Sequence, residues 1–217
     1  PTGGGKSLCY QLPALMLEGT AIVISPLISL MKDQVDALKA NGIAASFFNS
    51  SQSTEVQNDI LRDLHHQKLK LLYVAPESLS ILLSHFKESS ISLFAIDEAH
   101  CISAWGHDFR PAYVQLGQLK EKFPQIPVAA LTATADKATQ DDIVHQLHIP
   151  NANKHLASFD RKNLYLEVRP GTKRIQQIFQ FLQDRKNQSG IIYCLSRKST
   201  EDIAEKLQAR GYEAQAY

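Results

Sequence analysis

Short apolar runs alternate with helical patterns along most of the chain. The apolar runs cover residues 21–24, 45–48, 69–74, 94–96 and 128–131. Between them, apolar residues recur at helical spacing, as in Leu27, Leu30, Met31, Val35 and Leu38 and again in Val56, Ile60, Leu61 and Leu64. Apolar runs without polar alternation are typical of strands buried on both faces, and crossover helices connect such strands in parallel. The sequence therefore predicts an α/β fold built on a parallel sheet.

A glycine-rich turn stands at the beginning of the sequence, in the run Pro1-Thr2-Gly3-Gly4-Gly5-Lys6-Ser7. The backbone amides of such a turn, here Gly3, Gly4 and Gly5, cradle phosphate groups. In this pattern the lysine reaches the outer phosphates, and the Ser7 hydroxyl binds Mg²⁺ as the next helix begins. We therefore expect a phosphate-binding loop (P-loop) with ATP and Mg²⁺ as cofactors. A complete motif has a further small residue and a strand before it, so we expect the domain to begin upstream of Pro1.

An acidic pair, Asp97-Glu98, follows the apolar run 92–96. P-loop ATPases hold the same metal ion with an acidic residue at the end of a neighbouring strand, so Asp97 is a candidate Mg²⁺ ligand. The alternative is a solvated acidic pair or a helix cap. The P-loop favours the metal ligand and indicates ATP hydrolysis.

Other polar residues also follow predicted strands, in Ser25-Pro26, Ala75-Pro76 and Thr132-Ala133-Thr134. Ligands of open α/β sheets bind beyond the carboxyl ends of the strands. We therefore expect these segments to line the same edge of the sheet as the P-loop and Asp97.

Composition excludes some classes of protein. The formal net charge of +1 excludes a globally basic nucleic-acid binder, although a local basic groove is compatible with it. No apolar stretch is long enough to cross a bilayer, and no signal-peptide pattern is present, so we expect no membrane partner.

The cysteines and histidines give no sign of a structural metal or a disulfide framework. Cys9, Cys101 and Cys194 are isolated in the sequence, which favours a reducing intracellular compartment. We expect this compartment to be either the cytoplasm, in association with a bacterial nucleoid, or the nucleus. His100 and His107 stand near Cys101 and Asp108, but no spacing supplies three or four convergent ligands. We expect surface histidines.

The regular alternation breaks between about residues 149 and 173, and we place a domain boundary near Phe159. The first domain then covers residues 1–158. Residues 159–217 begin a second domain, with expected strands at 164–168 and 191–194 and a helix after each. We expect the chain to end within a further strand, at Tyr217.

The run Asp97-Glu98-Ala99-His100-Cys101-Ile102-Ser103-Ala104-Trp105-Gly106-His107-Asp108-Phe109-Arg110-Pro111 joins an acidic box to an aromatic-rich loop. With residues 131–135 and 191–194, it resembles the RecQ-like DNA helicases of superfamily two, over the whole chain. The resemblance implies a RecA-like P-loop domain with a DEAH box, followed by the start of a second RecA-like domain. It also implies that Lys6 and Ser7 bind phosphate and metal, that Asp97 holds Mg²⁺ through water, and that Glu98 orients and deprotonates the attacking water.

For DNA, the resemblance implies that His100 couples the nucleotide site to the DNA surface and that the aromatic-rich loop senses single-stranded DNA. The residues that it assigns to DNA binding or coupling are Trp105, Phe109, Arg110, Ser25, Lys32, Thr132 and Thr134. The alternatives are a core position for Trp105, a structural role for His100, and helix or strand capping by Ser25, Ser78, Thr132 and Thr134. The chain departs from the family pattern at Ala104, commonly glutamine, and at Ala112, often glutamate.

The resulting hypothesis is the motor core of an ATP-dependent DNA helicase. ATP hydrolysis would drive translocation on single-stranded DNA and unwinding of partly duplex DNA, in repair and recombination, with 3′-5′ direction implied by the resemblance alone. We expect residues 1–217 alone to be inactive. The alternatives are an ATP-gated nucleic-acid-binding module without unwinding, and another P-loop machine such as a protein remodeller or transporter ATPase.

Overall fold

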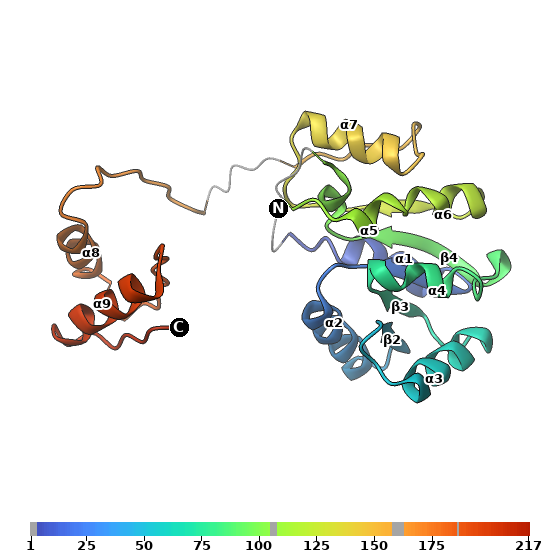
Figure 1. The fold of residues 1–217 in the computed structure, drawn as a ribbon, viewed down its shortest axis with the longest axis horizontal. Coiled ribbons are helices and arrows are strands. Elements are labelled where there is room, and N and C mark those ends of the chain that lie inside the picture. Colours follow the sequence, from blue (N-terminus) through green and yellow to red (C-terminus); the bar gives the residue numbers. More distant parts are fainter. Residues whose placement is uncertain (1–3, 105–107, 158–162, 186) are drawn as a thin grey trace. The chain divides into compact units, whose positions relative to one another are not determined.

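The computed structural model describes residues 4–104, 108–157, 163–185 and 187–217 (Figure 1). The chain divides into two compact units, Pro1–Asp160 and Arg161–Tyr217. Within the described residues, every assigned strand belongs to the first unit, and no helix is both long and apolar enough to span a membrane.

The first unit is built on a five-stranded sheet with strand order β2-β3-β1-β4-β5. The strands are β1 (Thr20–Ile24), β2 (Ala45–Phe48), β3 (Leu71–Val74), β4 (Ile91–Ile96) and β5 (Val128–Ala130). Every neighbouring pair is parallel. The predicted α/β fold with a parallel sheet is therefore confirmed.

The register of the three central strands makes their carboxyl ends level. Ile24 pairs with Val74 of β3 and with Ile96 of β4. The ladder continues past the strands, because the Asp97 amide donates to the Ile24 carbonyl at 2.9 Å and the Ser25 amide donates to Val74 at 3.1 Å. The segments that follow β1, β3 and β4 therefore leave the sheet at one edge.

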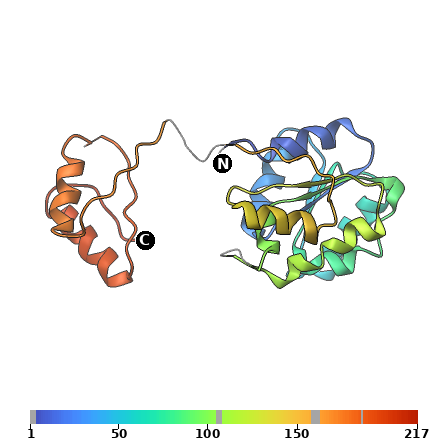
Figure 2. The same ribbon diagram turned by 90° about the horizontal axis from the view of Figure 1, so that it is seen from above.

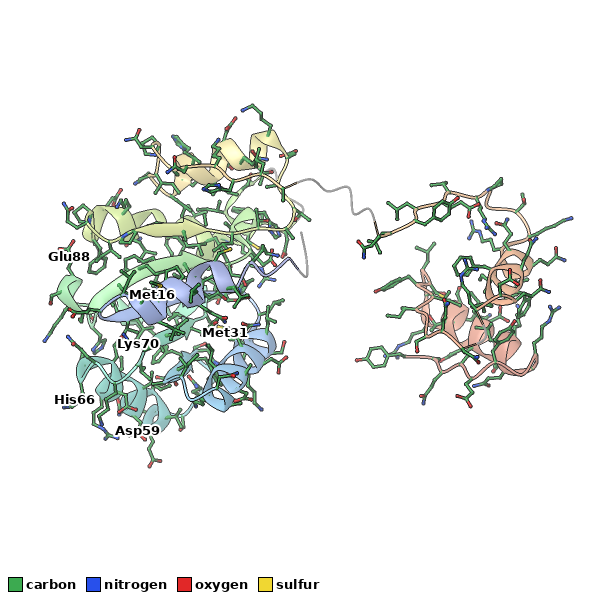
Figure 3. The ribbon with its side chains drawn as sticks, turned by 180° about the vertical axis from the view of Figure 1, so that it is seen from behind. Met16, Met31, Asp59, His66, Lys70 and Glu88 are labelled. Atoms are coloured by element: carbon green, nitrogen blue, oxygen red, sulfur yellow. The ribbon has the colours of Figure 1, made fainter. Side chains whose placement is uncertain are left out.

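Helices cover both faces of this sheet (Figures 1 and 2). One apolar core joins α1 (Leu8–Met16) and α2 (Ile28–Ala40) to the strand residues of one face. In this core Met31 is fully buried, whereas Met16 on α1 is 79% exposed (Figure 3). The other core holds α3 (Thr54–His65), α4 (Leu79–Leu82), α5 (Pro111–Val114), α6 (Gly117–Lys122) and α7 (Lys137–Gln146). The 3₁₀ turns are η1 (Pro76–Ser78), η2 (Glu88–Ser90) and η3 (Ala99–Ile102).

The second unit contains α8 (Arg174–Leu182) and α9 (Arg197–Gln208). The rings of Phe179 and Tyr212 stack at 6.5 Å between centroids, and the guanidinium of Arg210 lies 3.9 Å from the Phe179 centroid. The expected strands at 164–168 and 191–194 are wrong for this structure, and residues 214–217 are not a strand either. An apolar run becomes a strand only when a neighbouring strand accepts and donates its backbone hydrogen bonds. Leu166 and Val168 have no such neighbour among the described residues of this unit, and they are at least 90% exposed.

Gly19 occupies a turn before β1 that tolerates no side chain. Its φ of +91° is rarely adopted by other residues, and a Cβ there would lie 2.7 Å from the Ser90 carbonyl oxygen. We predict that Gly19→Ala lowers the free energy of unfolding by about 2 kcal/mol, because backbone strain and a backbone clash add. Urea unfolding of the chain measures this.

Gly42→Ala is the matched control, because Gly42 also has positive φ, +74°, but a Cβ there meets nothing within 4 Å. It should cost about 1 kcal/mol from strain alone. Equal losses in the two variants would show that the clash at Gly19 contributes nothing.

The two units predict where a protease cuts first. Residues 151–157 and 163–174 are exposed, and exposed segments between compact units are preferred sites of cleavage. Limited proteolysis followed by mass spectrometry should therefore give first cuts between Pro150 and Gly171. First cuts within β3 or β5 would contradict this assignment of the units.

Candidate active site

The P-loop precedes α1 and passes directly into it. Gly5 has φ of +75°, which the missing side chain permits. The Leu8 amide donates to the Gly5 carbonyl at 3.0 Å and the Gln11 amide donates to Ser7 at 2.9 Å, so the first helical turn closes on the loop. A helix amino terminus favours anions, as the phosphate-binding interpretation requires. Gly3 lies outside the described residues.

Asp97 follows β4 at the same edge as the P-loop. Burial, and then the neighbouring charge of Glu98, raise the pKa of the Asp97 carboxyl, whereas the Glu98 amide, Lys6 and His100 lower it. The Glu98 amide donates to Asp97 Oδ1 at 3.0 Å. Lys6 is therefore one of the groups whose charge acts on the Asp97 carboxyl. The Asp97 carboxylate and the Ser7 hydroxyl offer oxygen atoms, the ligand type that Mg²⁺ prefers, so these residues are compatible with a divalent metal.

Glu98 has a backbone conformation that its sequence gives no sign of. Its φ and ψ are +48° and +45°, in the left-handed region. This conformation costs a residue with a side chain about 1–2 kcal/mol and persists only where surrounding bonds enforce it. Here the Ala99 amide donates to the Leu131 carbonyl at 2.9 Å, and the Cys101 amide donates to Glu98 at 2.9 Å.

His100 connects Glu98 to the loop after β5. Its Nδ1 lies 3.3 Å from Glu98 Oε2 and 2.8 Å from the Thr132 hydroxyl, which also accepts from the Thr134 amide at 3.1 Å. The structure therefore brings together three of the predicted coupling residues. The expectation of a surface histidine is wrong for His100, which is only 6% exposed, because η3 folds back against the core directly after β4.

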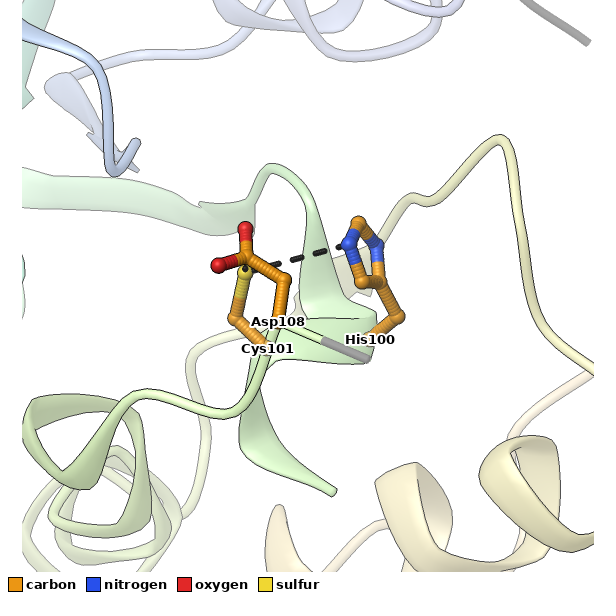
Figure 4. Close-up of side chains that lie close together, drawn as sticks. All are labelled: His100, Cys101 and Asp108. Atoms are coloured by element: carbon orange, nitrogen blue, oxygen red, sulfur yellow. Dashed lines mark hydrogen bonds between the residues drawn. The ribbon is translucent and has the colours of Figure 1, made fainter. Parts of the chain in front are cut away.

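Cys101 and Asp108 meet beside His100 (Figure 4). The buried Cys101 thiol donates to Asp108 Oδ2 at 3.5 Å, and its Sγ lies 3.9 Å from His100 Nε2. Three possible metal-ligand atoms converge within 4.8 Å, a juxtaposition that sequence spacing does not reveal. Burial raises the pKa of the Cys101 thiol to about 12, so the thiol stays protonated as a donor to Asp108. We interpret the group as a hydrogen-bonded cluster.

Arg110 links the aromatic-rich loop to the segment after β1. Its Nη1 donates to the Pro26 carbonyl at 3.2 Å, its amide donates to the Cys101 carbonyl at 2.9 Å, and its side chain lies 3.6 Å from Asp108. Phe109 is 42% exposed, and its stacking on DNA bases stays a prediction. Trp105 lies outside the described residues.

The predicted contacts at the strand ends differ in exposure. Lys32 is exposed in the second turn of α2, as a phosphate contact requires. Ser25 is only 2% exposed, and its hydroxyl, like that of Ser78, has no hydrogen-bond partner among the described residues. Neither serine caps the helix that follows it, because the N-caps of α2, η1 and α4 lack a side-chain bond. DNA contact by Ser25 stays a prediction.

Two further side chains at this edge were not predicted. The Tyr113 hydroxyl donates to the Asp97 carbonyl at 2.9 Å, and Gln115 Nε2 donates to the Pro76 carbonyl at 2.9 Å. The sequence gives no sign that these two residues bind backbone carbonyls, because neither belongs to a recognisable motif. Tyr113 lies within the short helix α5, and Gln115 directly follows it. Their roles follow only from the carbonyl groups that they reach.

Comparison with known proteins places this geometry in a family. A family model described as DEAD/DEAH box helicase matches residues 1–143. The chain is also similar to the solved structure of the Pyrococcus furiosus Hef helicase domain, with a TM-score of 0.55 and 16% identity, over 97% of this chain and 49% of that one. The second likeness concerns the fold alone.

Curated relatives match the whole chain. It is 53% identical to the ATP-dependent DNA helicase RecQ of Haemophilus influenzae, over 100% of this chain and 35% of the relative. It is 46% identical to the Bacillus subtilis protein of the same name, over 100% of this chain and 37% of the relative. The chain thus spans about a third of the length of these relatives. The matched family model, which covers the P-loop, the acidic pair and the loops around them, shows that the chain belongs to the DEAD/DEAH box helicase family.

Proposed function

We propose that this chain forms the nucleotide-binding part of an ATP-dependent DNA helicase motor related to RecQ. Residues 1–158 would be the first RecA-like domain, and residues 159–217 would begin the second. The observation that carries the proposal is the path from Glu98 through His100 to Thr132. That path joins a hydrolytic acid to loops at the edge where DNA would bind, which an ATPase without a nucleic-acid partner does not need.

ATP would bind at the start of α1. The Gly4 and Gly5 amides and the Lys6 ammonium would hold its phosphates, and Ser7 and Asp97 would hold Mg²⁺ with the oxygen ligands that this ion prefers. When bound, the ion supplies positive charge that offsets the charge developing on the phosphates. Lys6 contributes further positive charge.

Glu98 would act on the water that attacks the outermost phosphate. Its carboxylate orients this water and accepts a proton from it, which is positioning and general-base chemistry. His100 lies against the same carboxylate and can restrain its rotation. His100 also contacts the Thr132 hydroxyl. If the loop after β5 that contains Thr132 moved, His100 would therefore move with it and change the position of the Glu98 carboxylate.

Single-stranded and partly duplex DNA would be the partner at the carboxyl edge of the sheet. Lys32 and the helix starts there would contact phosphates without reading sequence, while Trp105, Phe109 and Arg110 would offer surfaces on which unpaired bases stack. Hydrolysis would then drive translocation and unwinding in DNA repair and recombination, within the cytoplasm or the nucleus. The names of the relatives support this partner.

A second candidate is an ATP-gated DNA-binding module that does not unwind. Ala104 and Ala112 allow it, because they depart from the family pattern near the aromatic-rich loop, whereas the intact catalytic residues favour the motor. DNA-stimulated ATP hydrolysis without strand separation by the full-length protein would select this alternative.

The acid assignment predicts the effect of Glu98→Gln. This change removes the proton acceptor but leaves the P-loop and Asp97 intact, so hydrolysis should fall about 10²- to 10⁴-fold while ATP still binds. Steady-state ATPase rates and fluorescent-nucleotide titration of the full-length protein measure the two effects.

Glu88→Gln is the matched control for Glu98→Gln. Glu88 is exposed in η2 before β4, so the same chemical change there should leave hydrolysis unchanged. Near-normal turnover of the Glu98 variant would refute the assignment.

The DNA-sensing assignment predicts the effect of Trp105→Ala in the full-length protein. Basal hydrolysis should persist, because no phosphate or metal ligand changes, whereas stimulation by DNA and unwinding should be lost together. The loss of one stacked base costs about 1–3 kcal/mol, which weakens a signal without abolishing DNA binding through phosphates.

A core role of Trp105 predicts a different pattern. Truncation of a large buried side chain lowers thermal stability and basal hydrolysis alike. Melting temperature and ATPase rates with and without single-stranded DNA distinguish the two, and a destabilised variant with normal stimulation by DNA would eliminate the sensor role.

A further inference from the structure

The peptide between Asp97 and Glu98 is fixed on both of its sides. The Tyr113 hydroxyl donates to its carbonyl oxygen at 2.9 Å, and the Asp97 carboxylate accepts its N–H at 3.0 Å. Asp97 lies one residue beyond β4. Its carbonyl oxygen therefore accepts a hydrogen bond from a side chain and not from the backbone of a neighbouring strand. Tyr113 is fully buried, so its ring cannot swing away without disturbing the core.

The orientation of this peptide decides where the Glu98 carboxylate lies. Glu98 directly precedes η3 and has a left-handed backbone conformation. If the peptide group between Asp97 and Glu98 rotated, the Glu98 side chain would point in another direction. A left-handed residue with a side chain relaxes unless its neighbours prevent it. The hydrogen bond from Tyr113 to the Asp97 carbonyl therefore helps to hold the strained turn on one side of Glu98. The hydrogen bond from the Cys101 amide to the Glu98 carbonyl holds it on the other side.

The same tyrosine belongs to the element that follows the aromatic-rich loop. The Tyr113 amide donates to the Arg110 carbonyl at 2.9 Å, and Arg110 donates to the Pro26 carbonyl. Just beyond α5, Gln115 donates to the Pro76 carbonyl. Side chains in and beside α5 therefore reach backbone carbonyls after β4, β1 and β3. A shift of Arg110 would move the start of α5 and, with it, the Tyr113 hydroxyl.

We propose that Tyr113 is a positioning residue for Glu98, which transmits the position of the aromatic-rich loop to the hydrolytic site through the Asp97 carbonyl. It contacts neither ATP nor metal and acts through Glu98 alone. This route is separate from the one through His100, because it reaches the backbone of the acidic pair instead of the carboxylate. The proposal rests on the proposed function for the role of Glu98.

Tyr113→Phe in the full-length protein tests the proposal, because it removes one hydroxyl and keeps the ring. We expect kcat for DNA-stimulated hydrolysis to fall about tenfold or more, as a misplaced catalytic group does. KM for ATP and fluorescent-nucleotide affinity should stay within about twofold, because the P-loop is untouched. Amide hydrogen exchange should rise in residues 97–102.

Thr20→Val is the matched control. Thr20 is fully buried at the start of β1, and its hydroxyl donates to the Leu69 carbonyl at 2.7 Å. This variant also loses one buried hydroxyl-to-carbonyl bond, but at the opposite end of the sheet. It should lower the melting temperature by a similar amount while kcat and exchange in residues 97–102 stay at parental values.

The outcomes separate this inference from the proposed function. Parental kcat in Tyr113→Phe, or an equal loss in Thr20→Val, would overturn the positioning role even if Glu98→Gln is inactive. A Tyr113→Phe protein that no longer binds nucleotide would also overturn it, because it would show a general structural role. Normal hydrolysis by Glu98→Gln would instead refute the proposed function itself.

Discussion

The hydrogen bond from the Asp97 amide to the Ile24 carbonyl extends the β1–β4 ladder one residue past both strands. It places the acidic pair beside the segment after β1 and holds β4 in the register on which the site depends. Because side chains alternate between the faces of a strand, a slip of one residue would turn the buried side chains of β4 to the opposite face and displace the acidic pair that follows it. The two apolar cores oppose such a slip, since β1, β3 and β4 each bury residues on both faces of the sheet.

Two features of the acidic pair cost free energy. Burial and Glu98 make the charge on Asp97 costly, and Glu98 adopts a left-handed backbone. Individual hydrogen bonds, the charge of Lys6 and the neighbouring His100 offset these costs, each by a small amount. A strained turn held by a few bonds responds to the loss of any one of them.

Backbone carbonyls are the common acceptors at this edge. Arg110 reaches Pro26, Tyr113 reaches Asp97, and Gln115 reaches Pro76. A second path runs from Glu98 through His100 to the Thr132 hydroxyl. The loops after β1, β3, β4 and β5 are therefore joined by side chains from the segment that follows β4. Such a network connects Arg110 to the ends of four strands.

The parallel sheet, the P-loop and the acidic pair could be predicted from the sequence, because apolar runs and short motifs are local patterns. The left-handed turn at Glu98, the burial of His100 and the approach of Cys101 to Asp108 could not. They depend on how η3 and α5 pack against the core, and pairs such as Tyr113 and Asp97 are brought together only by the tertiary fold. Residues 164–168 and 191–194 show the converse: their apolar pattern is local, but a strand also requires a neighbouring strand to bond with.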